Sequence, residues 1–193
     1  MAPVAAARRP GLRRWAVSVA ATAMSAYALD AGATAAGVCL VASGLLGGLG
    51  HRWTVVFLVL SYAVWALGLR AGVRANGALL AATGTSTNVL SKAAYDLTRR
   101  RTAGPRAARL AAAAGYVVTE LVKEVPYYGG AFGAVLISDS ITSNDALVFL
   151  AGANLGAAVY EYGLARLTGL VLRRRRALPP GNREVRTVRD RGG

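Results

Sequence analysis

The chain has 193 residues, of which 54% are hydrophobic and only 17% are charged, and its mean hydropathy is +0.40. This composition excludes a disordered chain or a disulfide scaffold and argues against a soluble enzyme. The formal net charge is +14, with arginines clustered at both ends of the chain and around positions 99–109. Because these clusters flank apolar segments, they indicate contact with anionic membrane lipids at cytoplasmic helix ends. We do not expect nucleic acid as a partner.

Two residue types that occur only once exclude further chemistry. Cys39 is the only cysteine, so no intrachain disulfide and no thiolate metal cage can form. His51 is the only histidine, which excludes a His-rich zinc or di-iron site, and its place beside Arg52 is typical of an interfacial loop. We therefore expect no metal and no other cofactor.

Three membrane spans are predicted in the N-terminal half. Residues 1–14 form a basic cytoplasmic segment, and the apolar run 15–29 is a retained helix, since further apolar segments follow it directly. A tight turn at Asp30 is expected to join this helix to a second one at 35–50. The alternative is one longer helix that buries Asp30. The third span covers 55–69, with tryptophans near both of its ends as membrane-interface residues.

The next two predicted spans flank the longest charged connection. A fourth helix is expected over 78–97, followed by the arginine-rich stretch 99–109, in which Gly104 and Pro105 break the helix. The fifth span is 107–137, and Pro126 predicts a kink or a re-entrant break within it.

A last helix over 144–172 precedes a basic, flexible tail, 173–193. An even number of crossings must separate the arginine clusters if all of them face the cytoplasm. The sequence thus predicts an all-α, polytopic bundle of about six transmembrane helices (residues 15–172) in the cell (inner) membrane, with both termini cytoplasmic. Small residues spaced four apart predict close helix contacts, at Gly129 and Gly133 and at Gly152 and Gly156.

Acidic residues within the apolar segments are the first candidate site. Glu120 and Glu124 are four residues apart, so a helix places both on one face, which Tyr116 shares. Lys123 is within reach of Glu120. Charge buried in hydrocarbon is costly, so such residues point to a functional site.

Glu161 carries the same argument to the last helix. It lies between Tyr160 and Tyr162, two turns after Asn154, at a depth similar to that of the glutamates in the fifth span. One interpretation is an interfacial network in which Glu161 pairs with Lys123 or an arginine. The interpretation that we prefer is a polar pocket inside the bundle, because three carboxylates outnumber one lysine. A carboxyl group in an apolar site without a partner cation holds its proton at neutral pH.

A polar stripe on the expected fourth helix is the second candidate. Thr85, Asn88 and Lys92 would share one face of a helix over 78–97. Threonine in a membrane helix often bonds back to its own backbone, but Asn88 and Lys92 are not explained in that way.

These residues suggest a metal-independent enzyme embedded in the membrane. In size, helix number and its set of glutamates and tyrosines, the chain resembles the small integral-membrane terpene cyclases. The resemblance implies proton-initiated cyclisation or isomerisation of a hydrophobic, isoprenoid or lipid-like substrate. Glu120, Glu124 and Glu161 would be catalytic, and the substrate-binding residues would be Tyr116, Tyr160, Tyr162, Asn88, Lys92, Lys123 and Asn154.

Two alternatives remain open at the level of sequence. The first is a small proton-coupled transporter or channel, in which the same carboxylates would carry protons; at this length it would need to be a homo-oligomer. The second is a membrane scaffold subunit whose polar residues meet the helices of a partner.

Overall fold

The computed structural model describes residues 12–45, 50–101 and 104–177. Within these ranges the chain is all-helical and contains no strand, which confirms the predicted class. The described residues form five α-helices where the sequence predicts about six. In chain order they are α1 (Leu12–Leu40), which continues as a π-helical turn (Val41–Leu45), α2 (His51–Thr83), α3 (Val89–Arg101), α4 (Pro105–Ile137) and α5 (Ser143–Ala177).

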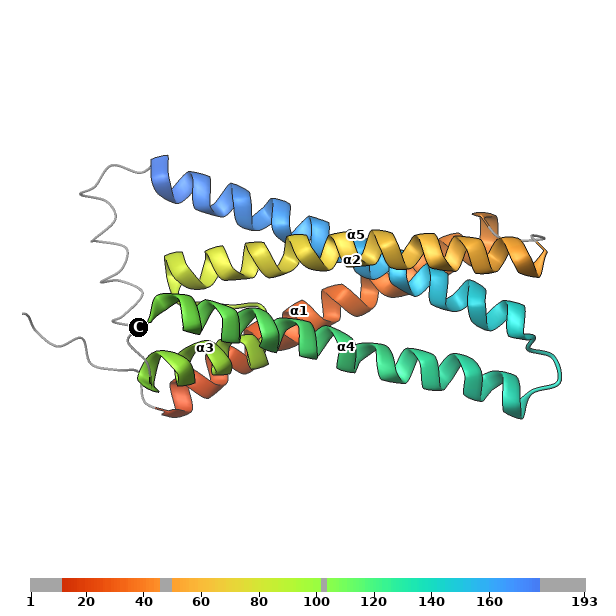
Figure 1. Ribbon diagram of the computed structural model, residues 1–193, viewed down its shortest axis with the longest axis horizontal. Coiled ribbons are helices and arrows are strands. Elements are labelled where there is room, and N and C mark those ends of the chain that lie inside the picture. Colours follow the sequence, from red (N-terminus) through yellow and green to blue (C-terminus); the bar gives the residue numbers. More distant parts are fainter. Residues whose placement is uncertain (1–11, 46–49, 102–103, 178–193) are drawn as a thin grey trace, which may run out of the picture.

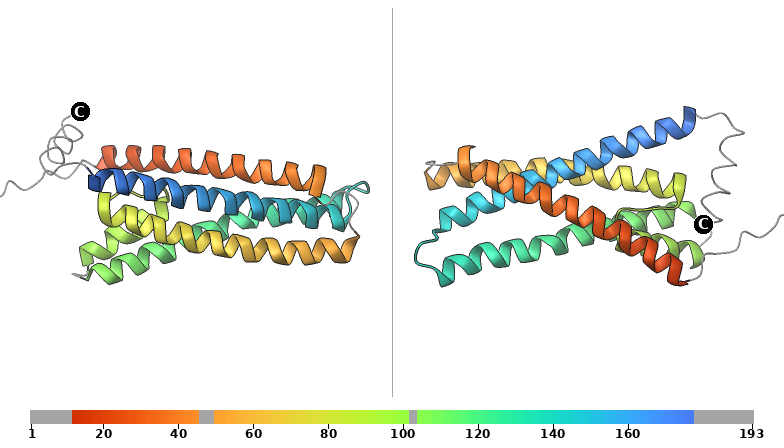
Figure 2. Two further views of the ribbon diagram at one scale, coloured as in Figure 1. Left: turned by 90° about the horizontal axis from the view of Figure 1, so that it is seen from above. Right: turned by 180° about the vertical axis from the view of Figure 1, so that it is seen from behind.

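Four long helices run lengthwise through the molecule, and the short α3 lies at one end (Figure 1). The start of α1, the junction of α3 and α4, and the end of α5 all lie at that same end (Figure 2). It carries Arg99–Arg101 and Arg173 and is called the basic end below. The connection between α4 and α5, with Asp139 and Asp145, lies at the opposite end.

In the part of the chain that the structure describes, three helices are long and apolar enough to cross a membrane. These stretches lie in α1, α2 and α5 and cover Met24–Ser43, His51–Thr83 and Ser143–Arg174. A membrane location therefore agrees with the composition of the helices. The helix α4 is as long as α2, at 33 residues, but Glu120, Lys123 and Glu124 lie near its middle.

The first predicted turn is absent. Asp30 lies inside α1 with 4% of its surface exposed, so the alternative of one longer helix is the correct one. Likewise, α2 does not end at residue 69 and continues through Arg70 and Arg74 to Thr83. Trp65, expected at a membrane interface, is instead buried against α5.

The predicted helix over 78–97 is wrong, because the chain breaks at Gly84. This glycine has a φ of 71°, the left-handed conformation that glycine adopts without strain, and it ends α2. Residues 85–88 then double back along the bundle, and α3 returns to the basic end (Figure 1). Segment 84–101 is called the re-entrant hairpin below. Consequently Thr85, Asn88 and Lys92 do not share one helix face.

The last two helices agree with the sequence. The predicted spans 107–137 and 144–172 correspond to α4 and α5. However, α4 continues through Pro126 and the following glycines, so the expected break is absent. The ends 1–11 and 178–193 of the expected basic segment and tail lie outside the described residues, while residues 12–14 begin α1 and 173–177 end α5.

Close backbone contact joins α1 to α5. A Cβ atom added at Gly156 would lie 2.3 Å from the carbonyl oxygen of Ala33, and one at Gly152 would lie 2.6 Å from Val38 Cα. This confirms the predicted helix contact of this pair. Gly129 and Gly133 face open space, so the same prediction is wrong for them.

Candidate functional site

An ion-paired cluster joins α1 to α4 in the middle of both helices. Lys123 Nζ lies 2.7 Å from Asp30 Oδ2 and 2.8 Å from Glu120 Oε1. Both carboxylate side chains are 6% exposed and the lysine 19%. Buried charges persist when they are paired and hydrogen-bonded in this way. The pairing also explains why Asp30 can lie inside an apolar helix.

A further carboxylate, that of Glu161, is buried without an ion pair. Glu161 of α5 is 1% exposed, and the hydroxyl of Tyr116 donates to it, with its oxygen 2.9 Å from Oε2 and 3.1 Å from Oε1. No described lysine or arginine forms an ion pair with Glu161. It lies over the bare backbone of Gly72, where an added Cβ would be 1.6 Å from Oε2. A side chain at position 72 would fill the space that the carboxylate occupies.

The cluster has more carboxyl groups than cations. Glu124 lies close enough to Asp30 and Glu120 to interact electrostatically with both. Asp30 Oδ1 and Glu124 Oε2 are buried and have no hydrogen-bond partner. With Glu161, four carboxyl groups lie close enough to Lys123 to interact with it electrostatically. Carboxyl groups that outnumber the cations near them in an apolar setting favour the protonated form.

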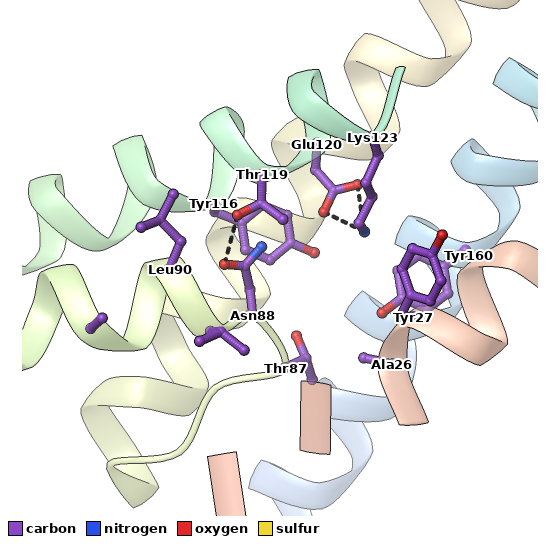
Figure 3. A pocket seen from close by; sticks show the side chains of 12 residues that line it. Ala26, Tyr27, Thr87, Asn88, Leu90, Tyr116, Thr119, Glu120, Lys123 and Tyr160 are labelled. Carbon is purple, nitrogen blue, oxygen red and sulfur yellow. Dashed lines mark hydrogen bonds and ion pairs between the residues drawn. The ribbon is translucent and has the colours of Figure 1, made fainter. Parts of the chain in front are cut away.

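A pocket of about 380 Å³ adjoins the cluster (Figure 3). Figure 3 shows the Glu120–Lys123 pair and Tyr116 on one side, Tyr27 and Tyr160 on another, and the start of α3 opposite. Lys123 Nζ is 5.9 Å from the centre of the Tyr160 ring. The lining residues come from α1, α4, α5 and the re-entrant hairpin, namely Ala26, Tyr27, Thr87, Asn88, Val89, Leu90, Ala93, Tyr116, Thr119, Glu120, Lys123 and Tyr160.

Asn88 fixes the re-entrant hairpin at the edge of this pocket. Its Oδ1 accepts from the backbone N–H of Ser91 at 2.9 Å and from Thr119 Oγ1 of α4 at 3.1 Å. It is therefore the N-cap of α3 and a link to α4 at once. Behind it, Asn76 of α2 bonds to the hydroxyls of Ser86 and Ser91 at 2.6 and 2.7 Å. These bonds satisfy polar groups of a non-helical segment inside the bundle.

Most of the residues singled out in the sequence meet here. Glu120, Lys123, Tyr116, Tyr160 and Asn88 line the pocket. Glu161 lies directly behind Tyr116 and reaches the pocket only through that hydroxyl.

Four other sequence candidates lie outside the pocket. Tyr162 is 42% exposed, and Lys92 forms an ion pair with Asp96. Asn154 donates to Ser61 at 3.2 Å, and Glu124 is half-buried beside the cluster. Tyr160 and Tyr162, which flank Glu161 in the sequence, therefore do not face the same site, because consecutive residues of a helix are rotated by about 100°.

Several residues of the cluster and of the pocket have no counterpart in the sequence prediction. The most informative is Asp30 of the cluster, which was assigned to a turn although a single acid in an apolar run is itself a signal of a functional site. Thr87, Thr119 and Tyr27 carry no such signal, because polar and aromatic residues of this kind are common in membrane helices.

Within the described residues, no group of three or more histidine, cysteine, aspartate or glutamate side chains could hold a metal ion. No known protein family, no curated protein and no solved structure matches this chain. The resemblance to integral-membrane terpene cyclases therefore stays a prediction, and the function has to be argued from the site.

Proposed function

We propose that the chain is a multi-pass membrane protein in which α1, α2, α4 and α5 all cross the bilayer, with the basic end in the cytoplasm. Connectivity supports this proposal: α2 runs toward the basic end, α4 starts there, and α5 starts at the opposite end (Figure 1). If α2 and α5 cross, α4 has to cover the same distance. The charges in the middle of α4 are met inside the bundle, where Lys123 pairs with Glu120 and Asp30.

Within this bundle, the pocket is proposed to carry out metal-independent acid–base chemistry on an isoprenoid or other lipid-like molecule. One observation carries the proposal. The hydroxyl of Tyr116, a pocket residue, is hydrogen-bonded to Glu161, a fully buried carboxyl group without an ion pair. A buried carboxyl group of this kind can supply a proton to a water-poor site.

The proposed reaction begins with Glu161 protonated and donating to the oxygen of Tyr116, whose own hydrogen is then turned from Glu161 toward the substrate. As Glu161 passes its proton to the oxygen of Tyr116, the tyrosine gives its own to a double bond or epoxide of the substrate. The resulting carbocation would face the rings of Tyr27 and Tyr160. Transfer of a proton from this cation to Glu120 yields a cyclised or isomerised product, and the proton then returns to Glu161. No proton is gained or lost overall.

Replacement of the proton donor tests this proposal. The full chain in lipid nanodiscs would be incubated with a membrane lipid extract, and new products would be followed by mass spectrometry. We expect Glu161→Gln and Tyr116→Phe to lower product formation by roughly 10²–10⁴-fold, the usual contribution of a positioned acid or base. Tyr162→Phe, next to Glu161 but exposed, is the matched control and should keep activity.

Full activity in each of Glu120→Gln, Glu124→Gln and Glu161→Gln would contradict the proposed chemistry. If the wild-type protein forms no product but carries protons across vesicle membranes, the second candidate function applies. That candidate, a proton-coupled transporter, is favoured by one observation. The re-entrant hairpin brings a capped helix start to a pocket that lies partway along the long helices.

A further inference from the structure

We propose that the pocket takes its ligand sideways from the bilayer, through a gap between α1 and α3, and that it selects an uncharged or cationic polar end over a phosphorylated one. This inference rests on the proposed function only in treating the pocket as a binding site inside a membrane protein. It adds a route of entry and a class of ligand that acid–base chemistry alone does not specify.

The route follows from how α1 packs. Its extensive packing is against α5, and it touches α3 in only a few places. Figure 2 shows α1 crossing the bundle obliquely, with its packing partner α5 beside it. The pocket lies between α1 on one side and α3 and α4 on the other (Figure 3). The Asp30–Lys123 ion pair links α1 to α4 beside the pocket.

The rim of the pocket is apolar and exposed. Tyr27 of α1 is 58% exposed, and Val89 and Leu90 at the start of α3 are 43% and 45% exposed. In a bilayer these side chains contact lipid chains and not water. A ligand that is dissolved in the membrane can therefore reach the pocket without leaving the hydrocarbon.

One wall of this largely apolar pocket carries polar side chains. Tyr116, Thr119, Glu120 and Lys123 all come from α4 and lie opposite the rim. The volume of about 380 Å³ is at the lower end of the range for ligand pockets, ~300–1,000 Å³. The site thus fits the polar end and the first part of an apolar chain, while the rest of the chain stays in the lipid.

Charge decides which polar end fits. Lys123 is the only cationic side chain among the pocket-lining residues, and it already contacts Glu120 and Asp30 at 2.8 and 2.7 Å. A phosphate that took this ammonium group would leave two buried carboxylates unpaired, which is strongly unfavourable. A hydroxyl, epoxide or carbonyl group can instead bond to Tyr116 or Thr119, and an ammonium group can bond to Glu120.

The start of α3 does not make the pocket favourable for a phosphate. Helix N-termini bind phosphate through free backbone N–H groups. Here two of these donors are taken up inside the chain, because the N–H of Asn88 donates to Ser86 Oγ and that of Ser91 donates to Asn88 Oδ1. The N–H groups of Val89 and Leu90 remain, and two uncharged donors do not offset the excess of carboxylates.

Photolabelling tests both parts of the inference. Three photoreactive probes would share one apolar chain and differ in their polar end, as an alcohol, an amine and a phosphate. Each would be added to the full chain in nanodiscs, and the labelled peptides would be identified by mass spectrometry. We expect the alcohol and the amine to label α1, α3 and α4 around the pocket, with about tenfold less labelling by the phosphate.

A pair of alanine variants on α1 tests the route. Ala26 lines the pocket, so Ala26→Trp should fill its mouth and lower labelling about tenfold. Ala28 is exposed and outside the pocket, and Ala28→Trp should label like the wild type. Thermal unfolding of both variants checks that they are folded.

Equal labelling by the phosphate probe would overturn the ligand class, and wild-type labelling of a folded Ala26→Trp would overturn the route. The probe comparison uses the unaltered chain, so it stands even if Ala26→Trp does not fold. Labelling needs no turnover. If the probes label as expected but Glu161→Gln is active, only the proposed chemistry is contradicted. If the phosphate probe labels as strongly as the others but Glu161→Gln is inactive, only this inference is contradicted.

Discussion

Glu161 depends on the absence of a side chain on a neighbouring helix. Its carboxylate occupies the space over Gly72 of α2, so a Cβ atom there would lie 1.6 Å from Oε2 and 2.6 Å from Cδ. The same Cβ would be 3.0 Å from the hydroxyl oxygen of Tyr116. Gly72 therefore allows Glu161 and Tyr116 to meet against α2, although it carries no functional group itself.

This contact predicts the effect of adding one methyl group. Gly72→Ala should push the Glu161 carboxylate away from Tyr116, abolish product formation and lower the free energy of unfolding by about 1–3 kcal/mol, as overpacking does. Gly77→Ala is the matched control, because its Cβ would meet open space on the same helix. Thermal unfolding in detergent and the product assay would check both variants. Wild-type activity in Gly72→Ala would show that Glu161 does not need this position.

The candidate residues could be found from the sequence because charge in an apolar run is rare. Glu120, Lys123 and Glu161 were singled out in that way, and Tyr116 followed from helical spacing. The second partner of Lys123 could not be found, since Asp30 precedes it by 93 residues and only the fold brings the two together.

At the scale of helices, the interface between α1 and α5 is set by glycine. A Cβ at Gly156 would lie 2.3 Å from a backbone oxygen and 2.5 Å from a Cα atom of α1. Because these are backbone atoms, they cannot move aside as a side chain does. The close approach of the two helices also sets the position of α1 relative to the pocket that it lines.

The expected effect of Gly156→Ala is separation of α1 from α5. We expect a loss of about 1–3 kcal/mol in the free energy of unfolding. Gly163→Ala on the same helix should be neutral or stabilising, since its Cβ would meet nothing within 4 Å and alanine favours the helix. Chemical unfolding in mixed micelles would measure both. Equal stability of the two variants would mean that this contact is not needed for packing.

Helix boundaries were predictable where the signal is local. Pro105 and the polar turn before Asp145 bound α4 and α5 at nearly the expected positions. The boundary between α2 and α3 was not predictable, because the residues after Arg74 are compatible with a helix and the turn at Gly84 does not stand out among them. The bonds that hold the re-entrant hairpin, such as Asn76 to Ser86, join residues ten positions apart and depend on the folded chain.

At the scale of the whole molecule, charge and connectivity point the same way. The start of α1, the end of α3, the start of α4 and the end of α5 share the basic end, while Asp139 and Asp145 lie at the other (Figure 1). The four crossings proposed above would place these arginine clusters on one side of a membrane, as six crossings also would. The arginine clusters in the sequence therefore predict only that the number of crossings is even, and they do not predict how many helices there are.

The crossing of α4 makes a prediction that labelling can check. In a Cys39→Ser chain, which has no other cysteine, Arg106→Cys would mark the start of α4 and Ser140→Cys the turn after it. Both positions are exposed. We expect a membrane-impermeant maleimide to label Ser140→Cys in intact cells, and Arg106→Cys only after the cells are permeabilised. Labelling after detergent solubilisation controls for reactivity.

Equal labelling of both positions in intact cells would place the two ends of α4 on one side of the membrane. The bundle would then cross an odd number of times, and Lys123 and its partners would lie at the surface. Opposite labelling instead requires the middle of α4, with Glu120 and Lys123, to pass through the hydrocarbon. In that setting, and with no cationic ligand in the pocket, protons have to neutralise the excess of carboxyl groups, which is the condition that the proposed chemistry needs.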